Sequence, residues 1–130
     1  MSSSHEKRVK KLLKARIVKG SGNGIIAKGD VKGAFVLVEC KASLGTMPSP
    51  DQHLGKIAHE AKVLDRIPSL STARFERNAV GELVMEDIHY FVPSDEANQT
   101  VDLGPAMDPK VPRYWLQMGE KEFVRWATKM

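Results

Sequence analysis

The 130-residue chain is poor in cysteine and aromatic residues and has no long apolar run. Its single cysteine, Cys40, cannot form a disulfide within the chain, which predicts a reducing, cytoplasmic compartment and excludes a cysteine-rich zinc site. No apolar run approaches the roughly 18 residues of a membrane-spanning helix, and residues 1–6 lack the apolar stretch of a secretory signal. We therefore expect one intracellular globular domain over residues 1–130, with no membrane partner.

Positive charge is concentrated near the N-terminus, although the net charge of the chain is only +4. Helical spacing of Val9, Leu12 and Leu13 predicts a helix over about residues 3–16, with lysines on the side opposite this apolar stripe. Such a basic face indicates a polyanion as the partner, and an ordinary solvated helix face is the alternative. The lysines predicted to contact this polyanion are Lys7, Lys10, Lys11, Lys14 and Lys19.

Hydropathy patterning predicts an α/β fold, with a single domain in which a mixed central sheet is flanked by helices. The run from Ala34 to Val38 is apolar at every position, which is typical of a central strand covered on both faces. Residues 93–112 are rich in Pro, Gly and Asp, and we expect a mobile loop there. The predicted helices cover residues 3–16, 51–65 and 121–129, and the predicted strands cover residues 25–31, 34–41, 69–75 and 82–92.

Glu39 is the anomaly of this apolar strand. Side chains on a strand alternate between faces, so Glu39 and Lys41 point to the same side as Phe35 and Leu37. A carboxylate and an ammonium on a core-like face are costly unless they are paired or bind a metal. A local ion pair at the end of the strand is the alternative explanation.

Two further carboxylates are placed where they can approach Glu39. Asp30 lies nine residues earlier, across a predicted turn at Lys32-Gly33, and Glu6 falls on the apolar stripe of the first helix. Ligation by oxygen atoms alone suits a hard cation such as Mg²⁺ or Mn²⁺. Turn chemistry is the alternative for Asp30, and a helix capping box that begins at Ser3 is the alternative for Glu6.

The order of these residues resembles the PD-(D/E)XK nuclease superfamily, and in particular its Holliday-junction resolvase branch. Gly29 stands where the superfamily usually has proline, and no family motif follows Phe75. The resemblance covers about residues 5–75, which would form the catalytic core. It rests on Glu6 in the first helix, on Ser21-Gly22 in a loop, on Gly29-Asp30 and on Val38-Glu39-Cys40-Lys41.

This resemblance implies a DNA endonuclease with a restriction-endonuclease-like core and Mg²⁺ as its cofactor, for which Mn²⁺ can substitute. Asp30, Glu39 and the backbone carbonyl of Cys40 would hold the cation, with Glu6 as a further ligand. Lys41 would orient the attacking water or offset the negative charge that develops on the phosphate. The catalytic residues that the resemblance implies are Glu6, Asp30, Glu39 and Lys41.

The expected activity is structure-selective cleavage of branched DNA such as Holliday junctions, by a homodimer, since two symmetric cuts need two sites. Ser21 would bind a DNA phosphate, with turn chemistry as the alternative. A nuclease or nickase for ordinary duplex DNA is the alternative enzyme, and a non-catalytic nucleic-acid-binding protein is the alternative without chemistry. Cys40 is expected to be a buried apolar residue, and His5 has no evident partner in the sequence.

Overall fold

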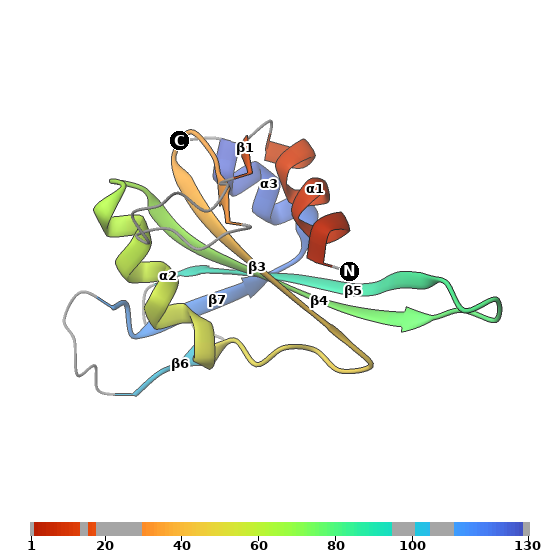
Figure 1. Ribbon diagram of the computed structural model, residues 1–130. Coiled ribbons are helices and arrows are strands. Elements are labelled where there is room, and N and C mark those ends of the chain that lie inside the picture. Colours follow the sequence, from red (N-terminus) through yellow and green to blue (C-terminus); the bar gives the residue numbers. More distant parts are fainter. Residues whose placement is uncertain (1, 14–15, 18–29, 95–100, 105–110, 129–130) are drawn as a thin grey trace.

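The computed structural model describes residues 2–13, 16–17, 30–94, 101–104 and 111–128, which form one mixed sheet with helices on both faces (Figure 1). This is the α/β architecture that the hydropathy pattern predicts. The helices are α1 (Ser2–Leu13), α2 (Asp51–Val63) and α3 (Glu120–Thr128). The strands are β1 (Arg16–Ile17), β2 (Val31–Lys32), β3 (Val36–Leu44), β4 (Ile67–Arg77), β5 (Leu83–Pro93), β6 (Val101–Asp102) and β7 (Tyr114–Met118).

The described strands lie side by side in the order β1-β2-β3-β4-β5-β7-β6. β3 and β4 pair in parallel, and the other described pairs are antiparallel. Parallel neighbours need a crossover connection, and α2 supplies it by packing on one face of the sheet. Val36, Leu37 and Val38 of β3 are all buried, because the strand is covered on both faces. The predicted strand began two residues too early, since Ala34 and Phe35 are exposed in the turn before β3.

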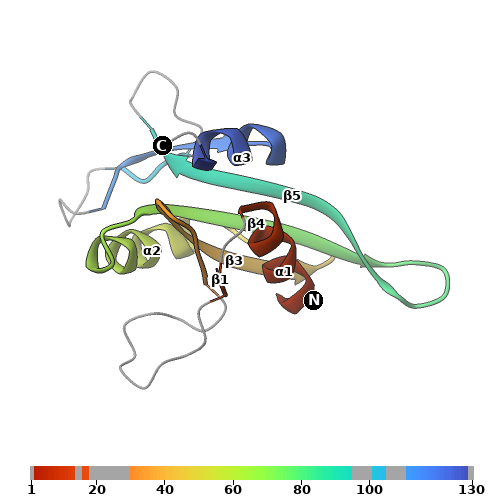
Figure 2. The same cartoon turned by 90° about the horizontal axis from the view of Figure 1, so that it is seen from above.

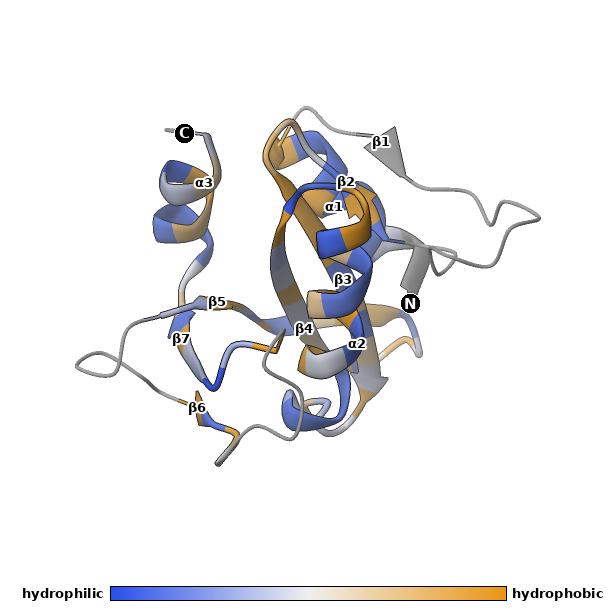
Figure 3. Ribbon diagram, turned by 90° about the vertical axis from the view of Figure 1, so that its left-hand side faces the viewer, coloured by the Kyte–Doolittle hydropathy of each residue, from blue (hydrophilic) through white to orange (hydrophobic). Residues whose placement is uncertain are grey.

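Two apolar cores lie on opposite faces of the sheet. α1 and α3 cover the face that carries Val38 and Tyr90, and Phe123 of α3 stacks on Tyr90 with 4.2 Å between ring centroids (Figure 2). α2 covers the other face, where Ile57 packs in one cluster with Leu37. Figure 3 shows the apolar residues concentrated in β3 and on the sides of the helices that face the sheet. None of the described helices is long and apolar enough to cross a membrane.

The N-terminal boundaries differ from the predicted ones. The first helix ends at Leu13, and the prediction that it continues to Arg16 was wrong, because Arg16 pairs with Lys32 as part of β1. Residues 25–29 of the predicted strand lie outside the described residues. Lys32 belongs to β2, so the turn begins one residue later than predicted, where the Gly33 amide donates to the Val36 carbonyl at 2.8 Å.

Two C-terminal strands were absent from the prediction. The stretch of residues 93–112 contains β6, and β7 follows it, with Tyr90 of β5 opposite Met118 of β7. Both strands are short, and neither is marked by a hairpin turn in the sequence. β7 pairs with β5 and with β6. The remaining predicted helices and strands are present, with ends that differ by a few residues.

A buried acidic cluster as the candidate active site

Asp30 and Glu39 meet because β2 and β3 form an antiparallel pair. Val31 lies opposite Val38, so extending this register by one residue sets Asp30 opposite Glu39. Both side chains are buried, since only 2% of Asp30 and 1% of Glu39 is exposed. Leu37 lies on the Glu39 side of β3 and packs in the α2 core, so both carboxylates lie beneath α2.

The helix α2 adds Lys56 and Glu60 to these carboxylates. The two residues are four positions apart and therefore lie on one side of the helix. Lys56 Nζ donates to Glu39 Oε1 at 3.1 Å and lies 3.7 Å from Glu60 Oε1. Sequence analysis missed both residues, although Glu60 carried a signal, because it interrupts the apolar stripe of α2 between Ile57 and Leu64. We call Asp30, Glu39, Glu60 and Lys56 the acidic cluster.

In the acidic cluster, one oxygen of each of the three carboxyl groups is buried with no donor group beside it among the described residues. Burial, a hydrogen bond with Glu60 and the charges of Glu60 and Glu39 raise the pKa of Asp30 to about 9. Burial acts to lower the pKa of Lys56, but its hydrogen bond to Glu39 and the surrounding carboxylates outweigh that effect and raise it. Asp30 Oδ2, Glu39 Oε2 and Glu60 Oε2 are buried without a hydrogen-bond partner. Unsatisfied buried oxygens of this kind indicate a place for a cation.

Lys41 stands at the rim of the acidic cluster. It follows Glu39 by two residues on β3, and its Nζ lies 3.7 Å from Glu39 Oε1. Its side chain is 39% exposed, against 1% for Glu39, so the ammonium contacts both the cluster and solvent. His53 of α2 lies near the same rim, where burial lowers its pKa and the charge of Glu39 partly opposes that effect. At this rim the acidic cluster meets solvent.

Glu6 belongs to the helix that packs on the opposite face of the sheet. α1 covers the face that carries Val38 and Cys40, and the charge of Glu6 acts on the buried Cys40 thiol. Burial is the main cause that raises the pKa of this thiol, so Cys40 is neutral and buried. The neighbours that shift the pKa of Asp30 come from β3 and α2. The structure therefore brings Asp30, Glu39 and Lys41 together and leaves Glu6 with the other core.

The basic face of α1 is present as far as the structure describes it. Lys7, Lys10 and Lys11 are exposed. The other residues predicted to contact DNA, Lys14, Lys19 and Ser21, lie outside the described residues. Because α1 and the acidic cluster lie on different faces of the sheet, a DNA molecule that contacts both must pass around a sheet edge.

The acidic cluster fits a magnesium-type cation in its donor chemistry. Within the described ranges, no three His, Cys, Asp or Glu side chains are arranged as a ready-made metal-binding group. Mg²⁺ keeps several waters and is commonly held by one or two carboxylates together with substrate phosphates. Asp30 and Glu39 meet that requirement, because each has one buried oxygen with no hydrogen-bond donor beside it in the described part of the chain, and a cation would satisfy these oxygens.

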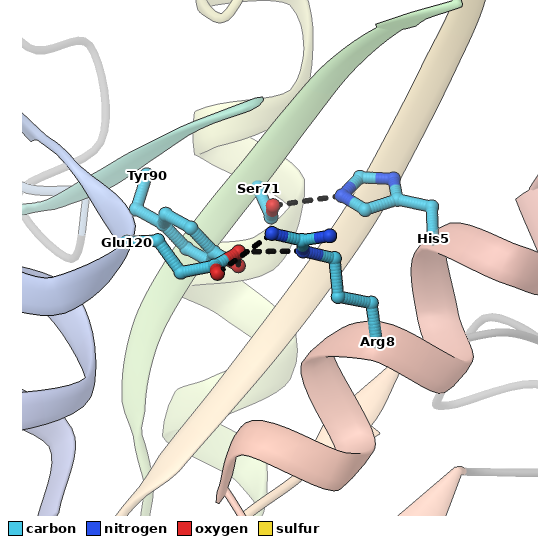
Figure 4. Close-up of polar contacts among 5 residues, drawn as sticks. All are labelled: His5, Arg8, Ser71, Tyr90 and Glu120. Carbon is cyan, nitrogen blue, oxygen red and sulfur yellow. Dashed lines mark hydrogen bonds and ion pairs between the residues drawn. The ribbon is translucent and has the colours of Figure 1, made fainter. Parts of the chain in front are cut away.

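A second polar group of residues ties α1 to α3 on the opposite face (Figure 4). Arg8 donates two hydrogen bonds, of 2.8 and 2.9 Å, to Glu120, which also accepts one from the Tyr90 hydroxyl at 3.1 Å. His5 is fully buried and its Nε2 shares a 2.8 Å hydrogen bond with Ser71 Oγ. No partner of His5 was evident in the sequence, because Ser71 is 66 residues away in the chain. These contacts join α1 to α3 and β4, and they join β5 to α3.

Comparison with known proteins adds no family assignment. No family model, no curated protein and no solved structure matches this chain. The resemblance to PD-(D/E)XK nucleases therefore stays a prediction, and the chemistry of the acidic cluster carries the functional argument.

Proposed function

We propose that this protein is a metal-dependent DNA endonuclease that hydrolyses phosphodiester bonds, with branched DNA such as Holliday junctions as its substrate. One observation carries the proposal: two carboxylates on adjacent strands are buried side by side, each with an unsatisfied oxygen, next to a lysine at the rim. A purely structural cluster of this kind is costly, since burial and the neighbouring carboxylates raise the pKa of Asp30 to about 9 and the buried Glu39 loses its hydration. A cation bound there would offset the cost of burying these carboxyl groups and could activate a water for hydrolysis.

Each residue of the proposed site has a distinct role. Asp30 and Glu39, with the Cys40 carbonyl, would hold Mg²⁺, which lowers the pKa of a bound water and neutralises charge on the phosphate. Lys41 is placed to contact the phosphate or the attacking water, because its ammonium reaches solvent while its stem follows Glu39. The exposed lysines of α1 would bind backbone phosphates without reading base sequence.

The preference for branched DNA and the homodimer extend this proposal. Contacts with backbone phosphates do not read sequence, so selectivity has to come from the shape of the DNA. Symmetric cleavage of a four-way junction needs two active sites related by a two-fold axis, which a homodimer provides.

Cleavage of a four-way junction and of a linear duplex, each with and without Mg²⁺, tests the proposal. The wild-type protein should cut the junction only with Mg²⁺, and Asp30→Asn and Glu39→Gln should abolish the cut without unfolding the chain. Asp65→Asn and Glu82→Gln are matched controls, since both positions are exposed and the backbone at Asp65, with φ of 55°, suits asparagine.

The other outcomes separate the alternatives. Equal cleavage of junction and duplex would assign a nuclease for ordinary DNA. Binding of DNA without cleavage in Mg²⁺ or Mn²⁺ would assign a non-catalytic nucleic-acid-binding protein. Cleavage by the Asp30→Asn, Glu39→Gln double variant at the wild-type rate would refute the site.

A further inference from the structure

We propose that Glu60 is a third carboxylate ligand of this cation site, and that Lys56 occupies the place of the cation until the cation binds. The inference rests on the proposed metal dependence and adds to it two residues of α2. It concerns how the site is held in the cation-free protein, which the pattern on β2 and β3 does not reveal.

Glu60 lies on the inward side of α2. Only 6% of the residue is exposed, and Ile57 and Ala61 are fully buried beside it. One of its oxygens, Oε2, is buried without a hydrogen-bond partner, while Oε1 lies 3.7 Å from Lys56 Nζ. A glutamate on the inward side of a packed helix is costly unless its charge is used. The helix thus holds a carboxylate against Asp30 and Glu39 at a fixed position.

The Lys56 ammonium lies between two carboxylates of the acidic cluster. It lies 3.1 Å from Glu39 Oε1 and 3.7 Å from Glu60 Oε1, so it stands between carboxylates that come from different elements. An ammonium is a compact positive charge, and it can neutralise this position in the absence of a metal ion. Lys56 Nζ therefore stands between Glu39 and Glu60, where a cation shared by these two carboxylates would bind.

Lys56 can move away from the carboxylates because about half of its side chain is exposed. Its side chain is 47% exposed, whereas those of Glu39 and Glu60 are 1% and 7% exposed. A flexible four-carbon stem can move the ammonium into solvent while the carboxylates stay fixed by β3 and α2. A divalent cation would therefore compete with Lys56 for the same oxygens, and the displaced ammonium would remain close to the rim that Lys41 occupies.

Binding of Mn²⁺ alone tests the inference, with the electron paramagnetic resonance signal of free Mn²⁺ as the readout. Glu60→Gln keeps the volume of the side chain and should weaken Mn²⁺ binding by at least about tenfold. Lys56→Met removes the competing ammonium and should tighten binding. Glu122→Gln and Lys62→Met are matched controls at exposed helix positions and should bind Mn²⁺ as the wild type does.

A melting curve with and without Mn²⁺ guards against misfolding of the variants. Lys56→Met should melt lower than wild type without Mn²⁺, because Glu39 loses its nearest cation, and should gain more from added Mn²⁺. Unchanged Mn²⁺ binding by Glu60→Gln, or weaker binding by Lys56→Met, would overturn the inference.

The same experiment separates this inference from the proposed nuclease function. If Asp30→Asn weakens Mn²⁺ binding and Glu60→Gln does not, the inference fails while metal-dependent cleavage can stand. If Glu60→Gln weakens binding but the wild-type protein cuts no DNA, the nuclease proposal fails and the inference stands. If the wild-type protein binds no Mn²⁺, both are refuted.

Discussion

His5 should make the stability of this fold sensitive to mild acid. The side chain is fully buried, its Nε2 contacts Ser71, and its Nδ1 is buried without a partner. Burial lowers the pKa of His5 from 6.5 to about 4, with help from the charge of Arg8 and against an opposing effect of Glu120. The unfolded chain therefore binds a proton at this site more readily than the folded protein does. Stability from this group is complete above about pH 6.5 and is lost as the pH falls toward 4.

The size of the effect follows from the two pKa values. At pH 5 the pH is about 1.5 units below the histidine pKa of the unfolded chain, so that histidine is mostly protonated. His5 in the folded protein is still mostly neutral at this pH. At about 1.36 kcal/mol per pH unit, the folded state loses about 2 kcal/mol relative to pH 7. With an m-value of about 2 kcal/mol/M, the urea midpoint should fall by about 1 M.

Urea denaturation of wild type and His5→Gln at pH 7 and pH 5 measures this loss. Glutamine cannot take up a proton, but its amide can still hydrogen-bond Ser71. The difference between the two proteins removes the effects of other groups, including Asp30, whose raised pKa favours the folded state as the pH falls. Equal losses of stability in wild type and His5→Gln between pH 7 and pH 5 would refute the reasoning.

Two further predictions concern the nuclease site and the basic face. Lys41→Ala should slow single-turnover cleavage by about a hundred- to a thousandfold while the Mg²⁺-loaded protein melts almost as wild type does, because the cation neutralises Glu39. A lower melting point with near-normal cleavage would instead make Lys41 a structural partner of Glu39. Replacing the basic-face lysines with glutamine should weaken DNA binding and reduce its salt dependence, by a slope of up to about 0.9 for each phosphate that a lysine no longer neutralises. The residues to replace are Lys7, Lys10, Lys11 and Lys14. An unchanged salt dependence of DNA binding would mean that this face is ordinary solvent-exposed surface.

The local hydropathy pattern was enough to predict which charged side chains lie on buried faces of the strands. The apolar run before Glu39 places that carboxylate on a buried side of a strand, because strand side chains alternate with period two whatever the partner. The short separation of Asp30 and Glu39 across a glycine turn predicts a hairpin, and the register of β2 and β3 follows from it. Helix α2 was predicted for the same reason, since its apolar residues recur at helical spacing within one segment.

Tertiary structure alone decided which residues complete the acidic cluster. Periodicity shows that Glu60 faces inward, but it does not say that α2 packs over β3, and that packing is what sets Lys56 against Glu39. Glu6 likewise faces inward, yet α1 packs on the other side of the sheet.

Partners that are distant in the chain follow the same rule. Ser71 satisfies His5 from 66 residues away, and β7 adds to the sheet by pairing with β5 across a long intervening segment. A sequence pattern fixes the face on which a side chain lies, because that depends on local backbone geometry. The element that meets this face depends on how the whole chain buries its apolar surface, and only the folded structure determines it.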